Sequence, residues 1–211
     1  MSSPKILRRQ PTQARARERV ERLLSVATEM IAETGSDAMR MTELAERAGV
    51  PIGSLYQYFP DKAAILRLLA IRVMERVREM LRRTIEGLDD PKEALTRIDQ
   101  ALVGYYQLFL TEPVTRDIWS ATQSDKALQE LDIEDSRVNA GLFFDAMKPI
   151  VPKHNHARLK AASFLLMQLS GAAVRLAIAV DRKEGDRLMT EYRFMIAREF
   201  ESLLVGEDRA F

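Results

Sequence analysis

The chain has 211 residues, a formal net charge of +1 and no cysteine. Disulfides, thiolate catalysis and cysteine-based zinc or iron–sulfur sites are therefore excluded. Charge is unevenly distributed: residues 1–85 carry 16 Lys and Arg against 10 Asp and Glu, whereas the remainder carries 16 against 21. A basic amino-terminal third followed by an acidic remainder is typical of a nucleic-acid-binding domain joined to another domain.

The amino-terminal residues read as a flexible basic arm followed by a helix. Pro4 and Pro11 oppose regular structure in residues 1–11. Thr12 is a suitable N-cap, and apolar residues then recur at helical spacing until Gly35, which is expected to end the helix. Contacts between this arm and DNA are expected if a DNA-reading element follows it.

Neither a targeting segment nor a membrane span is expected from the sequence. The first residues lack the apolar core of a signal peptide. The longest apolar stretch, residues 163–180, contains Gln168 and Arg175 and is short for a membrane span. We therefore expect a cytoplasmic protein that does not associate with a membrane.

Residues 41–62 read as two short helices joined by a tight turn. Gly49 falls at the turn, where a positive φ is needed and glycine adopts it at low cost. Ala45 is small where the two helices would cross most closely. The second helix is expected from about Pro51 to Phe59, because a proline is tolerated at a helix start. The apolar positions that would pack the two helices together are Leu44, Ala48, Val50, Leu55 and Tyr58.

The end of this stretch carries a specific motif. It reads Gly53-Ser54-Leu55-Tyr56-Gln57-Tyr58-Phe59-Pro60-Asp61-Lys62, and it resembles the signature of the TetR (tetracycline-repressor) family of bacterial regulators. The resemblance covers about residues 20–69. It implies an all-α fold of about nine helices, with three before a connector helix and five after it. The family often has serine at the position of Pro51, where it acts as a cap and a phosphate ligand, so Pro51 removes one expected phosphate contact.

The second helix of the pair is expected to read DNA in the major groove, where few side chains of a short helix reach base edges. Leu55 and Phe59 are expected to face inward. The residues expected to face outward are Ile52, Gly53, Ser54, Gln57 and Tyr58. Gln57 could form two hydrogen bonds with adenine, and Ile52 could contact a thymine methyl group. Gly53 would let the backbone approach the DNA closely.

Three further DNA contacts are implied by the family resemblance. Tyr56 and Lys62 occupy positions that typically contact phosphates in the family, and so does Thr42 at the start of the first helix of the pair. A hydroxyl at a helix amino terminus is also a good phosphate ligand on physical grounds. Core packing is the alternative role for Tyr56 and for Tyr58.

The domain limits are expected where helical periodicity is interrupted. Residues 1–60 would form the arm and the helix-turn-helix, 61–87 a connector helix, and 88–211 a helical domain for effector binding and dimerisation. Asp61 and Asp90 are suitable caps for the helices that follow them. Later helices are expected at about residues 90–110, around Trp119, and at 135–150, 155–180 and 186–204.

The last two helices are the expected dimer interface. Small residues there allow close helix contact, and larger apolar residues supply buried area. The larger ones are Leu165, Leu166, Leu169, Leu176, Phe194 and Phe200. In the TetR family these helices pair with their copies in a four-helix bundle, and the resemblance implies a homodimer that presents two heads to a pseudo-palindromic operator. Core packing within one chain must account for about half of these residues.

The middle helices offer residues for a largely apolar effector pocket, because aromatic and methionine side chains make adaptable cavities. The candidate ligand-binding residues are Tyr105, Phe109, Trp119, Phe143, Met147, Gln168 and Arg175. Core packing is the alternative for each apolar member. Arg175 would face an acidic ligand or an acidic residue across the dimer.

Enzyme chemistry, cofactors and metals are not expected. The sequence has no Gly-rich phosphate loop, Ser–His–Asp set or nucleotide fingerprint. His154 and His156 would not share a helix face. The acidic residues Asp132, Glu134 and Asp135 are expected to lie in a solvated loop or a helix start.

These features predict a dimeric TetR-like transcriptional repressor that a small molecule releases from a DNA operator. Three alternatives remain open: a DNA-binding regulator without a small-molecule effector, a helical small-molecule-binding protein with a vestigial DNA-binding head, and an architectural binder without sequence preference. Salt-dependent binding that prefers particular sequences would separate a regulator from a vestigial head.

Overall fold

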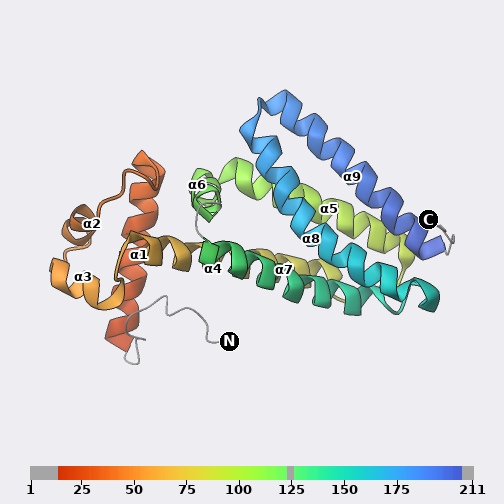
Figure 1. The fold of residues 1–211 in the computed structure, drawn as a ribbon, viewed down its shortest axis with the longest axis horizontal. Coiled ribbons are helices and arrows are strands. Elements are labelled where there is room, and N and C mark those ends of the chain that lie inside the picture. The colour runs from red at the N-terminus through yellow and green to blue at the C-terminus, as the bar shows by residue number, and fades with distance from the viewer. Residues whose placement is uncertain (1–13, 123–125, 206–211) are drawn as a thin grey trace. The chain divides into compact units, whose positions relative to one another are not determined.

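A computed structural model describes residues 14–122 and 126–205, and this part of the chain contains nine α-helices and no strand (Figure 1). The all-α prediction is therefore confirmed; the expected cap Thr12 lies outside the described residues. The helices are α1 (Ala14–Thr34), α2 (Met41–Arg47), α3 (Ile52–Tyr58), α4 (Lys62–Ile85), α5 (Pro91–Thr111), α6 (Pro113–Thr122), α7 (Lys126–Met147), α8 (His156–Ala179) and α9 (Arg182–Val205).

The chain divides into two compact units. The first, here called the head unit, comprises residues 1–73 and 112–129, and the second, the body unit, comprises residues 74–111 and 130–211. Helices α4 and α7 each contribute residues to both units. Helix α6, although it follows α5 in the sequence, belongs to the head unit.

The head unit is built on α1, which packs against α2 and α6. Gly35 ends α1 with a φ of 84°, as expected for a glycine that terminates a helix. The turn that follows is fixed at Ser36, whose backbone N–H donates to Asp117 Oδ2 of α6 over 2.6 Å. A buried apolar face on α1 fills the core with Val20, Leu23, Leu24, Ala27, Met30 and Ile31.

The body unit is organised around a helical hairpin in which α8 and α9 pack side by side, with α5 against both (Figure 1). The hairpin turn is capped by Asp181, whose carboxylate accepts hydrogen bonds from the backbone N–H groups of Lys183 and Glu184. The segment Lys153–Ala179 is long and apolar enough to cross a membrane, as core helices of globular proteins often are. In this unit the face of α8 that includes Leu159 and Leu166 is buried.

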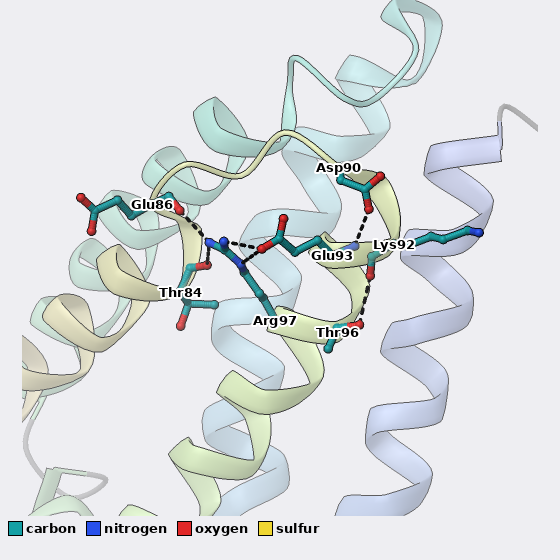
Figure 2. A network of polar contacts seen from close by, with 7 residues as sticks. All are labelled: Thr84, Glu86, Asp90, Lys92, Glu93, Thr96 and Arg97. Carbon is teal, nitrogen blue, oxygen red and sulfur yellow. Dashed lines mark hydrogen bonds and ion pairs between the residues drawn. The ribbon is translucent and has the colours of Figure 1, made fainter.

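The junction between α4 and α5 is held by one arginine (Figure 2). Arg97 donates through Nη1 to the backbone carbonyls of Thr84 and Glu86, and through Nε to the Glu93 carboxylate. Carbonyls at the end of a helix have no partner within that helix, so Arg97 acts as a cap for α4 supplied by the next helix. Asp90 caps α5 as predicted, since its carboxylate accepts from the N–H of Glu93 over 2.8 Å.

Two helices begin earlier than the sequence suggests. Helix α7 was expected from residue 135 but starts at Lys126, so Asp132 and Asp135 lie inside a helix and not in a solvated loop or at a helix start. Helix α9 was expected from residue 186 but starts at Arg182, because the Asp181 cap outweighs the low helix propensity of Gly185 in the first turn.

Candidate nucleic-acid interface

The second and third helices form the helix-turn-helix that the motif predicts. The two helices pack together, and Gly49 has a φ of 65° at the turn. The turn is closed by a hydrogen bond from Val50 N–H to the Ala45 carbonyl over 3.0 Å. Helix α3 begins directly after Pro51, and Leu55 and Phe59 are fully buried as expected.

The outward side of α3 presents most of the predicted DNA contacts, with one exception. Ile52, Gly53 and Gln57 are exposed and Ser54 is half-buried. The expectation that Tyr58 faces outward is wrong, because only 8% of its surface is exposed. Position 58 lies one helical turn beyond Leu55 and therefore shares its inward face.

The two tyrosines of the motif behave differently. Tyr56 is 40% exposed and is available to a phosphate, whereas Tyr58 belongs to the core of the head unit. Thr42 is exposed in the first turn of α2, and that helix has no side-chain cap among the described residues. Thr42 and Tyr56 are therefore both open to a ligand on the α2–α3 surface.

Lys62 has protein partners that the sequence does not reveal. Its ammonium group donates to the backbone carbonyls of Ser36 at 3.1 Å and Asp37 at 3.0 Å. An ammonium group has three donors, so these contacts leave capacity for one further acceptor. Lys62 thus helps to fix the turn after α1, the same turn that Asp117 holds from α6.

Two further arginines near the helix-turn-helix were not singled out from the sequence. Exposed Arg22 of α1 reaches the turn, since a side-chain carbon added at Gly49 would lie 3.4 Å from its Nη2 atom. Arg47 instead binds the carboxylates of Glu33 and Glu43, which raise its pKa. Charge alone could not separate these roles, because both side chains are basic and lie in amphipathic helices.

The body unit brings three of the predicted ligand-binding residues together around Asp132. Tyr105 of α5 and Arg175 of α8 both interact electrostatically with this carboxylate of α7, and Gln168 of α8, which donates to Ser136 Oγ over 2.7 Å, lies beside it. Burial raises the pKa of Asp132, and the positive charge of Arg175 opposes that rise. Burial likewise raises the pKa of Tyr105 well above its ordinary value. A carboxylate of the same chain therefore lies near Arg175, which the sequence does not reveal.

Of the other predicted ligand-binding residues, Phe109 contacts this group, and Phe143 and Met147 lie farther along α7. The rings of Phe143 and Phe200 pack edge to face at 5.3 Å, and Met147 is fully buried. Phe143 is eleven residues beyond Asp132 on α7, about 16 Å along the helix. The ring of Phe109 packs against Tyr105 at 5.2 Å. Trp119 is buried and belongs to the head unit.

Family comparisons agree with this architecture. Residues 23–69 match the family described as bacterial regulatory proteins, tetR family, and residues 92–203 match the tetracyclin repressor-like C-terminal domain. The chain is similar to the HTH-type transcriptional regulator HbdR of Aromatoleum sp. (strain CIB), with 37% identity over 78 residues. It is also similar to the repressor KstR of Rhodococcus jostii (strain RHA1), with 38% identity over 61 residues. These matches cover 37% and 29% of this chain, and only 34% and 29% of the two relatives.

Solved structures extend the similarity in fold over nearly the whole chain. A TetR-family transcriptional regulator from Pectobacterium atrosepticum superposes with a TM-score of 0.70 at 19% identity, covering 92% of this chain and 98% of that one. The structure of RolR in complex with resorcinol gives a TM-score of 0.59 at 22% identity, covering 94% and 98%. With its carboxy-terminal family match spanning more than half of the sequence, the chain belongs to the TetR family of bacterial regulatory proteins.

Proposed function

We propose that the protein is a dimeric transcriptional repressor that binds a pseudo-palindromic DNA operator and releases it when a small molecule binds the body unit. The observation that carries the DNA-binding part is the division of α3 into two sides. Leu55 and Tyr58 are buried, whereas Ile52, Gly53 and Gln57 are exposed on a helix short enough to enter a major groove. The protein would act in the cytoplasm and would not be an enzyme.

The exposed residues have distinct roles in this proposal. Gln57 would bond an adenine edge and Ile52 would contact a thymine methyl group. Tyr56, Thr42 and the remaining donor of Lys62 would bind phosphates and set the register. Ser54, which is half-buried, would contribute at the edge of the surface, and Tyr58 would support the helix from behind.

Replacing Gln57 with alanine is expected to relax the base preference at one position of each half-site. Loss of one bidentate base contact should cost about 1–3 kcal/mol against the preferred base and little against the other bases. The operator sequence is first selected from a random duplex pool with the wild-type protein. Binding of the wild-type and variant proteins is then measured on every single-base variant of the selected sequence. Gln107→Ala, at an exposed glutamine of α5, serves as the matched control. Equal loss of affinity for all the base variants would show that Gln57 contacts the DNA backbone and not a base. Failure to select any sequence from the pool would contradict the regulator proposal.

Replacing Gly53 with alanine is expected to separate folding from DNA binding. A side-chain carbon at this position would meet no atom of the chain within 4 Å, so nothing within the protein requires glycine there. Alanine should therefore stabilise α3 by about 0.5–1 kcal/mol while weakening operator binding, because the added methyl group would hold the backbone away from DNA. Thermal unfolding and operator titration of the same variant check both halves. Unchanged operator affinity would show that DNA does not approach the backbone at Gly53.

The effector would bind in the body unit beside Tyr105, Gln168 and Arg175. Together with Asp132, these residues offer hydrogen-bond donors and an acceptor in a half-buried setting, which suits a small, largely apolar molecule with a polar group. The likeness to RolR, whose structure contains resorcinol, is consistent with such a ligand. Any effector must bind the free protein more tightly than the operator complex, since the coupling is reciprocal. Equal effector affinity with and without operator would contradict this part of the proposal.

A further inference from the structure

The outer face of α9 carries a pattern of charges whose partners are not found within the described part of the chain. Arg187, Glu191, Arg198 and Glu201 are all exposed, and none of them forms an ion pair with another described residue of this chain. Other charged groups of the helix do have partners: Arg193 pairs with Asp99, Glu199 with Arg158 and Arg182 with Asp186.

These four charges flank Phe194 and Met195, which are the most exposed large apolar residues in the described part of the chain. Phe194 is 59% exposed and Met195 is 66% exposed. Arg187, Glu191, Phe194, Arg198 and Glu201 follow one another at intervals of four, three, four and three residues. That spacing places them on one narrow stripe, as in the seam of two paired helices. The stripe lies opposite the buried face formed by Met189, Tyr192, Ile196, Phe200 and Leu203.

The neighbouring helix continues this surface. Leu165, Leu169 and Leu176 are exposed along one side of α8 at intervals that keep them on one face. Helix α8 packs on α9, and Arg158 and Ser170 of α8 bond to Glu199 and Tyr192. The apolar residues of both helices therefore form an outer face that one chain leaves uncovered.

We propose that this face binds a second copy of the chain with the two α9 helices antiparallel and crossing between Phe194 and Met195, so that Glu191 meets Arg198 of the other copy and Arg187 meets Glu201. The inference rests on the dimer in the proposed function and adds its orientation and register. In a symmetric dimer each contact occurs twice, because residue i meets j and j meets i.

The order of the charges selects this arrangement over others. Along the stripe from Arg187 to Glu201 the signs run plus, minus, apolar centre, plus, minus. Reversing one copy about the centre sets every positive group against a negative one. A parallel pair would place each residue beside its own copy, so like charges would meet. A crossing point moved by one turn toward Glu191 or Arg198 would set that residue against itself. Charged seam positions commonly fix register and orientation in this way, at some cost in stability.

The test uses two single charge reversals in the full-length protein. Glu191→Arg alone should weaken the homodimer about tenfold or more, since two attractive pairs become repulsive. Arg198→Glu alone should do the same. Mixed together, the two variants should pair with each other, because each supplies the charge that the other lacks. Native mass spectrometry of mass-tagged variants should then show heterodimers in excess of random re-pairing, and the excess should shrink in high salt.

Controls separate the register from the dimer itself. Glu134→Arg, at an exposed site on α7, should pair with wild type at random. Phe194→Glu should abolish dimers whatever their register. If Phe194→Glu is monomeric but Glu191→Arg and Arg198→Glu re-pair at random, the register is wrong and the dimer through this face stands. If the wild-type protein is monomeric throughout, both the register and the dimer of the proposed function are overturned.

Discussion

Replacing Gly185 with alanine is expected to lower the free energy of unfolding of the body unit by about 3 kcal/mol. Gly185 lies in the first turn of α9, where the hairpin brings it against the end of α8. A side-chain carbon built at this position would lie 2.2 Å from the carbonyl oxygen of Ala177 and 3.0 Å from the hydroxyl of Tyr106. The nearer atom belongs to the backbone, so no rotamer change can relieve the clash and the two helices must separate.

A second glycine in the same unit provides the matched control for this experiment. Gly141 lies within α7, and an added carbon there would meet no atom within 4 Å. Gly141→Ala should therefore stabilise the unit by about 0.5–1 kcal/mol, since alanine is the better helix former. Urea denaturation followed by far-ultraviolet circular dichroism compares both variants with wild type. Equal effects of the two substitutions would show that the α8–α9 packing at Gly185 tolerates a side chain.

The Gly185 contact illustrates what periodicity alone cannot reveal. The helix-turn-helix and the caps Asp61 and Asp90 were predicted correctly, because each depends on local spacing or on one cap residue. The count of about nine helices, which the TetR resemblance implies, agrees with the nine in the described part of the chain. The start of α9 was placed too late because glycine usually marks a boundary. Here it is required by a close approach between two helices, and that approach is a tertiary property.

The candidate sites show the same limit for polar residues. Asp132 and Asp135 were assigned to a solvated loop or a helix start, but both interact with other helices of the body unit. A run of acidic residues looks the same in a loop and in a buried network, and only the partners distinguish the two. Tyr58 was misplaced for a related reason, since a tyrosine suits both a protein core and a DNA surface. Gln57 was placed correctly as an exposed residue, and Tyr56 has the exposure that its expected phosphate contact requires, but contact with DNA remains a prediction for both.

Breaking the contact between Arg78 and Asp135 should have the second large effect on stability. Arg78 of α4 donates to the Asp135 carboxylate of α7 and, through Nε, to Asn139 Oδ1 at 3.2 Å. Asn139 in turn donates to Asp135 over 2.8 Å, so the three side chains close a ring. The side chains of Arg78 and Asp135 are only 27% and 12% exposed. Removing one charge from such a pair leaves the other poorly solvated.

Arg78→Met is therefore expected to cost about 2–3 kcal/mol at neutral pH, with Asp135→Asn similar and the double variant costing less than the sum. The comparison is a double-mutant cycle measured by urea denaturation. Arg83→Met provides the control, because Arg83 lies on the same helix in an exposed pair with Glu79 and should change stability by less than about 0.5 kcal/mol. Additive costs would mean that Arg78 and Asp135 are not coupled.

The stability of the Arg78→Met variant should depend on pH, because the substitution leaves the Asp135 carboxylate without its positively charged partner. Burial already raises the pKa of Asp135 in the native protein, and Arg78 is the main influence that opposes the rise. Without Arg78 the folded-state pKa of Asp135 should rise further above its unfolded value. The folded variant then binds more protons than the unfolded chain between those two pKa values, so its stability falls as pH increases through that window.

The loss of unfolding free energy in Arg78→Met relative to wild type should thus be larger at about pH 7.5 than at about pH 4.5. A deficit that is independent of pH would assign the loss to packing of the arginine stem instead of to the buried carboxylate.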